Sequence, residues 1–280
     1  MSGGPTDIAA VASLPLLYEK RGAIAIITFN RPAARNALTP EMICRFADAI
    51  IDFAADDDLR VAIVTGSGDK AFCAGGDLAT AIPLLTGARP AADEWDRRVL
   101  EDPLVMPASG LRDFPLYKPV IAAINGACLA AGQEIALGTD IRVAAEHAIF
   151  GLPEVKRGVI PFAGSMVRLP RQLAYAQAME MMLTGDSIDA REAWRIGLVN
   201  HVVPAADVMT KALEIAGKIA ANGPVAVQRV KQTVMSASGR SLAEGYAFED
   251  ESKRVVLATE DAAEGPRAFM EKRAPRFVGR

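Results

Sequence analysis

The chain has 280 residues, with 31 lysines and arginines against 34 aspartates and glutamates, a net charge of −3 and 51% hydrophobic residues. This composition is typical of a globular protein with a large core, and it lacks the basic excess of a nucleic-acid-binding protein. Three scattered cysteines and only two histidines argue against a disulfide framework, a zinc site and a histidine-based triad.

The N-terminal stretch has no basic region followed by an unbroken apolar run, so no signal peptide is expected. The segment that most resembles a membrane span, residues 119–138, contains Pro119 and Asn125 and carries Glu134, which would be costly in lipid. We therefore expect this segment to be buried core in a cytoplasmic protein that does not enter a membrane.

Apolar, β-branched runs and helical patterns alternate through the first 200 residues. Strands are expected at residues 22–30, 61–65, 71–78, 120–124, 141–144, 148–150 and 198–203. Thr39 and Pro40 are typical of a helix start, and this helix should reach about Ala55. Further helices are expected at 131–139, 164–169, 173–184 and 189–196. Strands that alternate with helices predict an α/β fold with mostly parallel sheets.

Two other segments differ from this alternation. Residues 79–116 contain five prolines and no strong period, which is typical of a lid or binding loop. The last quarter is helical throughout, at 205–221, 224–236, 241–258 and 260–272. The chain is therefore expected to comprise a flexible N-terminus (1–15), an α/β core with the active site (16–204) and a helical C-terminal region (205–280).

Three segments combine glycine turns or carboxylates with apolar surroundings. Residues 71–78 (AFCAGGDL) would let a ligand approach the backbone at Gly75 and Gly76, although a plain tight turn is the more common meaning of such a pair. Residues 124–134 lead into a helix whose first N–H groups have no internal partner. Glu134 lies in its first turn, where the helix dipole alone could favour a carboxylate. Glu154 follows Pro153 in a loop, and an ordinary ion pair with Lys156 or Arg157 would also explain it.

Taken together, these segments offer backbone donors for an oxygen that gains negative charge and two glutamates for proton transfer. That combination predicts an enzyme that adds water across a polarised double bond. The residues alone do not identify the substrate.

These motifs and their order along the chain resemble the pattern of the crotonase family, the enoyl-CoA hydratases and isomerases, and the resemblance covers roughly residues 16–277. The resemblance lies in residues 35–38, 71–78, 121–126, 130–132, 139–141, 150–154 and 269–273. It implies a crotonase-like spiral of ββα units with a helical C-terminal trimerisation region, and a homotrimer or a dimer of trimers.

The resemblance also implies roles for individual residues. The N–H groups of Ala74 and Ala131 would hold the thioester oxygen, while Glu134 and Glu154 would act on water and on the proton at C2, with Glu154 delivering that proton. Residues around the CoA thioester would be Arg35, Ala37, Ala71, Cys73, Gly75, Gly76, Asp77, Leu78, Gly132, Phe162, Phe269 and Lys272, the contacts of Phe269 and Lys272 being made to a neighbouring subunit's substrate. Neither a metal nor a cofactor is implied, because CoA arrives as part of the substrate.

Three departures from the family pattern bear on the substrate. Ala130 and Ala131 stand where glycines are frequent, Phe162 stands where glycine is usual, and Lys156 with Arg157 replaces commonly apolar residues. Phe162 and the region of Trp95 are expected to set acyl specificity, although Trp95 could equally lie on an exposed lid.

The expected activity is hydration of a 2-enoyl-CoA, a lyase reaction. One alternative is another reaction of the family, namely double-bond isomerisation, carnitinyl-CoA dehydration or acyl-CoA hydrolysis. The other is a non-catalytic acyl-CoA- or RNA-binding paralogue, which the two glutamates and the absence of a basic stripe disfavour.

Overall fold

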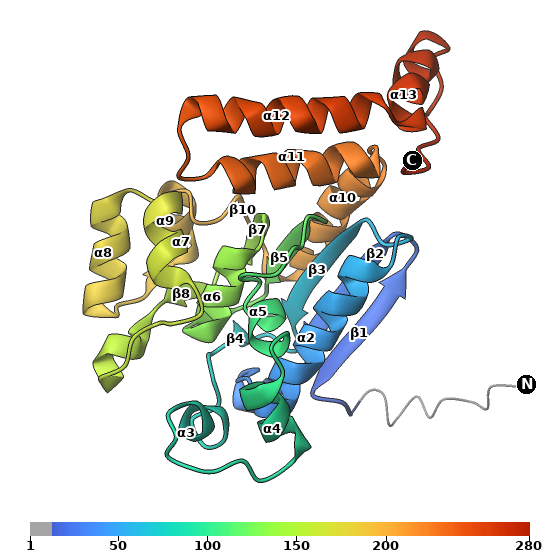
Figure 1. Cartoon of the computed structure of the whole chain (residues 1–280). Helices are drawn as coiled ribbons and strands as arrows, with labels where there is room; N and C mark the ends of the chain where they lie inside the picture. Colours follow the sequence, from blue (N-terminus) through green and yellow to red (C-terminus); the bar gives the residue numbers. More distant parts are fainter. Residues whose placement is uncertain (1–12) are drawn as a thin grey trace, which may run out of the picture.

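The strands of the protein form two sheets that lie beneath a layer of C-terminal helices (Figure 1). The computed structural model describes residues 13–280, so most of the segment expected to be flexible, residues 1–15, lies outside the described residues. Within residues 13–280, no helix combines the length and the hydropathy needed to cross a membrane.

Within the described residues, the larger sheet has six strands in the order β1-β2-β3-β5-β7-β10 and the smaller has four in the order β4-β6-β8-β9. The strands of the larger sheet are β1 (Leu16–Arg21), β2 (Ile24–Phe29), β3 (Val61–Gly66), β5 (Val120–Ile124), β7 (Ile141–Ala145) and β10 (His201–Val203). Those of the smaller sheet are β4 (Ala71–Cys73), β6 (Ala127–Leu129), β8 (Ile149–Gly151) and β9 (Ile188–Asp189). The pairs β1–β2 and β8–β9 are antiparallel, and the other pairs are parallel.

From β3 to β8, consecutive strands alternate between the two sheets, which produces the spiral of ββα units. The chain passes from β3 to β4, from β5 to β6 and from β7 to β8, and a helical segment follows each pair. Parallel pairing brings the ends of β4, β6 and β8 to one edge of the smaller sheet. The α/β class and the ββα arrangement are confirmed.

Three short 3₁₀ helices and twelve α-helices complete the described part of the chain. The 3₁₀ helices are η1 (Pro32–Ala34), η2 (Pro153–Arg157) and η3 (Ala205–Asp207). The α-helices are α2 (Pro40–Ala55), α3 (Ala81–Leu85), α4 (Glu94–Glu101), α5 (Val105–Ser109), α6 (Ala131–Gly138), α7 (Ser165–Gln172), α8 (Tyr175–Thr184), α9 (Ala190–Arg195), α10 (Val208–Ala220), α11 (Pro224–Ala237), α12 (Leu242–Leu257) and α13 (Glu260–Met270).

Helix α2 forms where Thr39 and Pro40 predict it, and it supplies part of the cavity described below. The Thr39 side chain accepts a hydrogen bond from the Met42 N–H, and Pro40 occupies the first helical turn. At the other end, the buried Lys118 ammonium donates to the carbonyl oxygens of Phe53 and Asp56. Cations favour the negative end of a helix dipole, so these bonds fix the C-terminus of α2.

The core lies between the sheets and the helices that cover them. Phe29 of β2 meets Phe46 of α2 and Phe72 of β4 edge to face, with ring centres 5.2 and 5.5 Å apart. Helix α10 packs against β3, β5 and β7 from the other side. Every residue of β3 and β5 is buried, as expected for strands covered on both faces.

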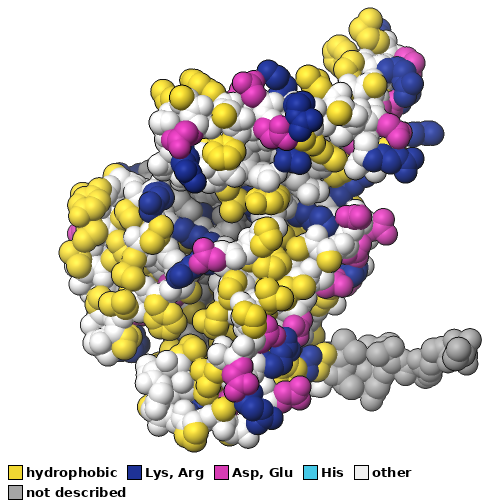
Figure 2. All heavy atoms as spheres, in the orientation of Figure 1, with side chains coloured by type: hydrophobic (Ala, Val, Ile, Leu, Met, Phe, Trp, Pro, Cys, Tyr) yellow, Lys and Arg dark blue, Asp and Glu magenta, His cyan; other side chains and the backbone are white. Residues whose placement is uncertain are grey.

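The C-terminal helices lie across one end of the sheets (Figure 1). No residue of α11 or α12 is buried, and their apolar side chains Val230, Val234, Tyr246 and Leu257 are strongly exposed. The chain end returns to the core, because Arg60 donates to the carbonyl oxygens of Ala220 and Phe277. Figure 2 shows a further group of apolar side chains over α7 and α8, where Val167, Tyr175 and Leu183 are exposed.

Three strands were not expected from the sequence: β9, whose two residues pair with β8, and the strands β1 and β6. Strand β1 begins with Leu16 and Leu17 but ends in charged residues, because its outer half lies exposed at the sheet edge, and it turns into β2 at Gly22 with φ +56°. Strand β6 is only three residues long and is held by pairing to β4 and β8. Neither shows a periodic pattern, since long-range pairing rather than local propensity determines both.

Candidate active site

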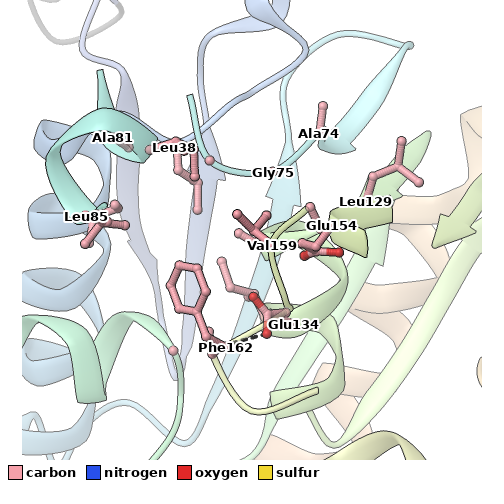
Figure 3. Close-up of a pocket in the computed structure, with 18 of the residues that line it drawn as sticks. Leu38, Ala74, Gly75, Ala81, Leu85, Leu129, Glu134, Glu154, Val159 and Phe162 are labelled. Atoms are coloured by element: carbon pink, nitrogen blue, oxygen red, sulfur yellow. Dashed lines mark hydrogen bonds between the residues drawn. The ribbon is translucent and has the colours of Figure 1, made fainter. Parts of the chain in front are cut away.

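A cavity of about 330 Å³ lies where β4, β6 and β8 end, in the size range of small-molecule sites. Figure 3 shows the carboxylates of Glu134 and Glu154 in this cavity, with Leu85 and Ala81 across from Glu154 and Leu129. The lining is mainly apolar, and its charged residues are Glu134, Glu154 and Arg157. Of the residues expected at the site, the cavity brings together Ala74, Gly75, Gly76, Leu78, Ala131, Glu134, Glu154 and Phe162.

The glycine loop after β4 is joined to the turn at residues 35–38. The N–H of Leu38 donates to the Gly75 carbonyl and the N–H of Asp77 donates to the Leu38 carbonyl. Asn36 is fully buried, with φ +57°, and its amide donates to the carbonyl oxygens of Ser67 and Ala71. The turn and the loop therefore form one rigid wall of the cavity.

The free backbone donor of this loop is at Gly76 and not at Ala74. The N–H of Ala74 donates to the Arg35 carbonyl at 3.1 Å, so it is not available to a ligand. The N–H of Gly76 has no acceptor in the described part of the chain. The expected role of Ala74 is thus contradicted, because a partner 39 positions away takes its hydrogen.

The N-terminus of α6 faces this loop. Ala130 has φ +51°, a conformation that favours glycine, and its own N–H donates to the Gly151 carbonyl. The N–H of Ala131, the first helical residue, has no acceptor among the described residues. A side chain at Gly75 would come within 2.8 Å of the Ala130 Cβ, which shows how closely the two loops approach.

Gly132 makes this approach possible. A Cβ built there would collide with the carbonyl oxygen of Cys73 at the end of β4. Cys73 itself is fully buried, and burial raises the pKa of its thiol to about 12. Gly132 and Cys73 therefore support the cavity without lining it.

Glu134 lies one turn into α6 and is almost fully buried. One of its oxygens, Oε1, accepts a hydrogen bond from the Ala163 N–H and another from the Ser165 hydroxyl, each at 2.7 Å. Burial raises the pKa of Glu134, while these bonds and the charge of Arg168 act in the opposite direction. The other oxygen, Oε2, has no partner among the described residues.

Glu154 lies in η2 and differs from Glu134 in its environment. Its buried Oε2 has no hydrogen-bond partner in residues 13–280. The pKa of Glu154 is raised to about 7, mainly by burial and also by the negative charge of Glu134, while a backbone hydrogen bond and the charge of Arg157 act in the opposite direction. The alternative that Glu154 is ion-paired with Lys156 or Arg157 does not hold, because the Lys156 ammonium is 2.5 Å from Asp186 and Arg157 donates to the Pro153 carbonyl.

The end of the cavity away from the glutamates is apolar. Its side chains come from the turn before α2, from α2, α3 and α5, and from the segment after η2, and they are Leu38, Ile43, Phe46, Ile82, Leu85, Met106, Val159 and Phe162. Phe162 is 44% exposed and borders a second, smaller cavity with Met106 and Arg112. Trp95 does not line the cavity; it lies near the guanidinium groups of Arg45 and Arg98, at 5.1 and 5.8 Å from its ring centre.

The remaining expected residues lie around the cavity or away from it. Ala37 and Ala71 lie in the backbone that joins the two loops, and Arg35 is exposed on the turn. Asp77 closes the turn before α3, accepting from the N–H groups of Ala79 and Thr80, and pairs with Arg31 at 3.0 Å. Phe269 and Lys272 are exposed at the end of α13, outside this chain's own cavity.

Sequence reasoning missed Ala163 and Ser165, which hold Glu134, and Ser109 and Met106, which line the cavity. Ser165 carries a sequence signal only in retrospect: it is a small polar residue at the start of an amphipathic helix. Nothing near it in the sequence indicates a carboxylate partner 31 residues away.

Comparisons with known proteins agree with this geometry. Residues 19–280 match the family model described as enoyl-CoA hydratase/isomerase. A Mycobacterium tuberculosis protein named enoyl-CoA hydratase is 43% identical over 277 residues, covering 98% of this chain and all of the relative. A Proteus mirabilis carnitinyl-CoA dehydratase is 39% identical over 265 residues, covering 93% of this chain and 97% of its own.

Solved structures of proteins with related names also match this chain over nearly its whole length. The crystal structure of an enoyl-CoA hydratase from Mycobacterium tuberculosis matches with a TM-score of 0.85 at 39% identity, covering 95% of this chain and 99% of that one. The structure of an enoyl-CoA hydratase from Bacillus anthracis matches with a TM-score of 0.85 at 35% identity, covering 95% and 100%.

Proposed function

Since the chain belongs to the enoyl-CoA hydratase/isomerase family, also called the crotonase family, we propose that it adds water to a 2-enoyl-CoA thioester. The observation that carries this proposal is the pair of buried glutamates in one cavity beside two free backbone N–H groups. One glutamate has a hydrogen-bonded oxygen and the other has a pKa of about 7, which suits a base and an acid respectively.

In this mechanism the N–H groups of Gly76 and Ala131 hold the thioester oxygen. They stabilise the negative charge that this oxygen gains when water attacks C3. Glu134 takes a proton from the attacking water as the new C3–O bond forms. Glu154 delivers its proton to C2, and the C2–C3 double bond becomes single. The starting state returns when Glu134 loses its proton and Glu154 regains one. CoA is part of the substrate, and no cofactor takes part.

The acyl end of the cavity supports an apolar acyl group. A quaternary ammonium group is best bound by aromatic faces or carboxylates. The cavity offers aliphatic side chains with the rings of Phe46 and Phe162, and Arg157 adds a positive charge to the lining, which opposes the binding of a cation. We therefore favour a fatty 2-enoyl group over carnitinyl-CoA, the substrate that the Proteus relative's name specifies.

The exposed C-terminal helices support assembly into a homotrimer or a dimer of trimers. Phe269 is 82% exposed in one chain, and with Lys272 it is free to contact CoA bound to a neighbouring copy.

The test is to incubate the protein with crotonyl-CoA and follow the loss of the conjugated enoyl absorbance, with carnitinyl-CoA dehydration measured in parallel. We expect rapid hydration of crotonyl-CoA and a much lower kcat/KM with carnitinyl-CoA. Rapid carnitinyl-CoA dehydration with weak crotonyl-CoA hydration would replace this proposal with the dehydratase alternative.

A further inference from the structure

Glu134 and Glu154 are chemically identical and share one cavity, yet their carboxylate oxygens differ in the hydrogen bonds that they accept. Oε1 of Glu134 accepts two hydrogen bonds of 2.7 Å, one from a backbone N–H and one from the Ser165 hydroxyl. The buried Oε2 of Glu154 accepts none in the described part of the chain. The two acids therefore differ in the hydrogen-bond donors that reach them.

Ser165 is placed so that its hydroxyl has little other use. It is fully buried as the first residue of α7, directly after Gly164, whose φ of +114° turns the chain into the helix. A serine at a helix start usually bonds to N–H groups of its own helix. In α7 the cap is Gly164 and Ser165 is the first helical residue, and the Ser165 hydroxyl reaches across to Glu134 of α6.

We infer that Ser165 is a positioning residue that keeps Glu134 ionised and oriented as the base, leaving the unpaired Glu154 as the acid. This inference rests on the proposed hydration. Because Oε1 is held by Ala163 and Ser165, Oε2 is the oxygen left to face the attacking water. A hydroxyl that donates to a carboxylate favours the charged form, so Ser165 opposes the effect of burial on the pKa of Glu134.

Other charged groups also act on this pair and must stay unchanged in the test. Glu134 faces the guanidinium of Arg168 on α7, and Glu154 faces Glu134 and the guanidinium of Arg157 on η2. Arg168 is fixed by bonds to the carbonyl oxygens of Gly110 and Leu111 at the end of α5. None of these bonds involves the Ser165 hydroxyl.

The experiment compares the pH dependence of kcat/KM for crotonyl-CoA in the wild type and in Ser165→Ala. Loss of the hydroxyl raises the pKa of Glu134, so the base is ionised only at higher pH. The acidic limb, the part of the profile where kcat/KM falls as the pH is lowered, therefore shifts to higher pH. The expected loss is roughly tenfold on the acidic side and smaller on the alkaline side, since one hydrogen bond to a charged group is lost. Substrate KM should change little.

Three further variants separate positioning from structural support. Ser165→Thr keeps the hydroxyl and should show the acidic limb at the same pH as the wild type. Ser165→Cys keeps the size but is a weak donor, so its limb should resemble that of Ser165→Ala even if the alanine variant folds poorly. Thr139→Val removes another buried hydroxyl, at the other end of α6, where Oγ1 donates to the Ala136 carbonyl. It should lower stability without moving the limb.

An unchanged acidic limb in both Ser165→Ala and Ser165→Cys, with an active wild type, would overturn the role of Ser165 and leave the proposed hydration intact. A wild type that hydrates no enoyl-CoA would instead overturn the proposed function itself.

Discussion

The proposed hydration needs the two carboxylates in different states, because at its start Glu134 must be charged and Glu154 must be protonated. Burial raises the pKa of Glu154 to about 7, far above the 4.5 of a free glutamate. Its proton is needed at C2, so hydration should decline as the pH rises through about 7. In Glu154→Gln the residual rate should lack this alkaline limb, as measured by kcat/KM against pH. A limb that persists in the glutamine variant would assign it to another group.

For single residues, the sequence predicted a role where the residue's own motif determines it, and not where a partner distant in the sequence does. Glu134 and Glu154 follow recognisable turns, so their motifs placed them correctly in one cavity. The backbone donor did not follow from the motif. Whether Ala74 or Gly76 has a free N–H depends on the Arg35 carbonyl, and only the folded turn brings that oxygen to Ala74. The role of Ser165 could not be predicted for the same reason, since its hydrogen-bond partner, Glu134, lies on another helix.

Among the elements, the segment after η2 and helices α3 and α5 determine the shape of the acyl end. The sequence indicated a long irregular stretch at 79–116, and the structure contains three short helices there. Short helical patches were visible in this stretch, but its prolines and weak period did not fix the helix bounds, because each helix is stabilised by packing against its neighbours, as α5 and α4 are against α2.

Phe162→Gly tests this end of the cavity. Removal of a ring that separates the main cavity from the smaller one should enlarge the acyl site, so kcat/KM should shift toward longer acyl chains, by several-fold per added methylene or more. The measurement is hydration of 2-enoyl-CoAs of increasing length. Trp95→Phe is the matched control, because Trp95 lies near two guanidinium groups outside the cavity and should leave the chain-length profile unchanged. Equal profiles for wild type and Phe162→Gly would exclude Phe162 as a specificity residue.

For the whole molecule, the helical last quarter was apparent from the sequence, but the way its end is held was not. Glu264 is buried with bonds from Arg267 and Arg273, and Asp261 accepts from the N–H groups of Val278 and Gly279. The Glu264 bonds join side chains up to nine positions apart, whereas the Asp261 bonds reach backbone groups up to 18 positions away, which leave no mark in the side-chain pattern. They hold the end of α13, with Phe269 exposed.

The proposed assembly predicts that Phe269 and Lys272 act on a neighbouring copy's substrate. Phe269→Ala with Lys272→Ala should raise the KM for CoA thioesters, while the thermal unfolding midpoint changes little because both side chains are exposed. Arg254→Ala, which removes an exposed cation paired with Glu251 within α12, should leave KM unchanged. Sedimentation should show a trimer or hexamer in all three proteins. A monomer with normal KM would refute the assembly.

The most direct test of the central claim, that both glutamates serve one water, is the rate of crotonyl-CoA hydration in Glu134→Gln, Glu154→Gln and the double variant. Each single change should reduce kcat by roughly 10²–10⁴-fold, since each removes a proton-transfer group. The double variant should lose far less than the product of the two, because groups that act as a unit are non-additive. Thioester binding should survive in all three, since the amide keeps the shape. Intact hydration in Glu134→Gln would contradict the account and indicate a family member that uses a single acid.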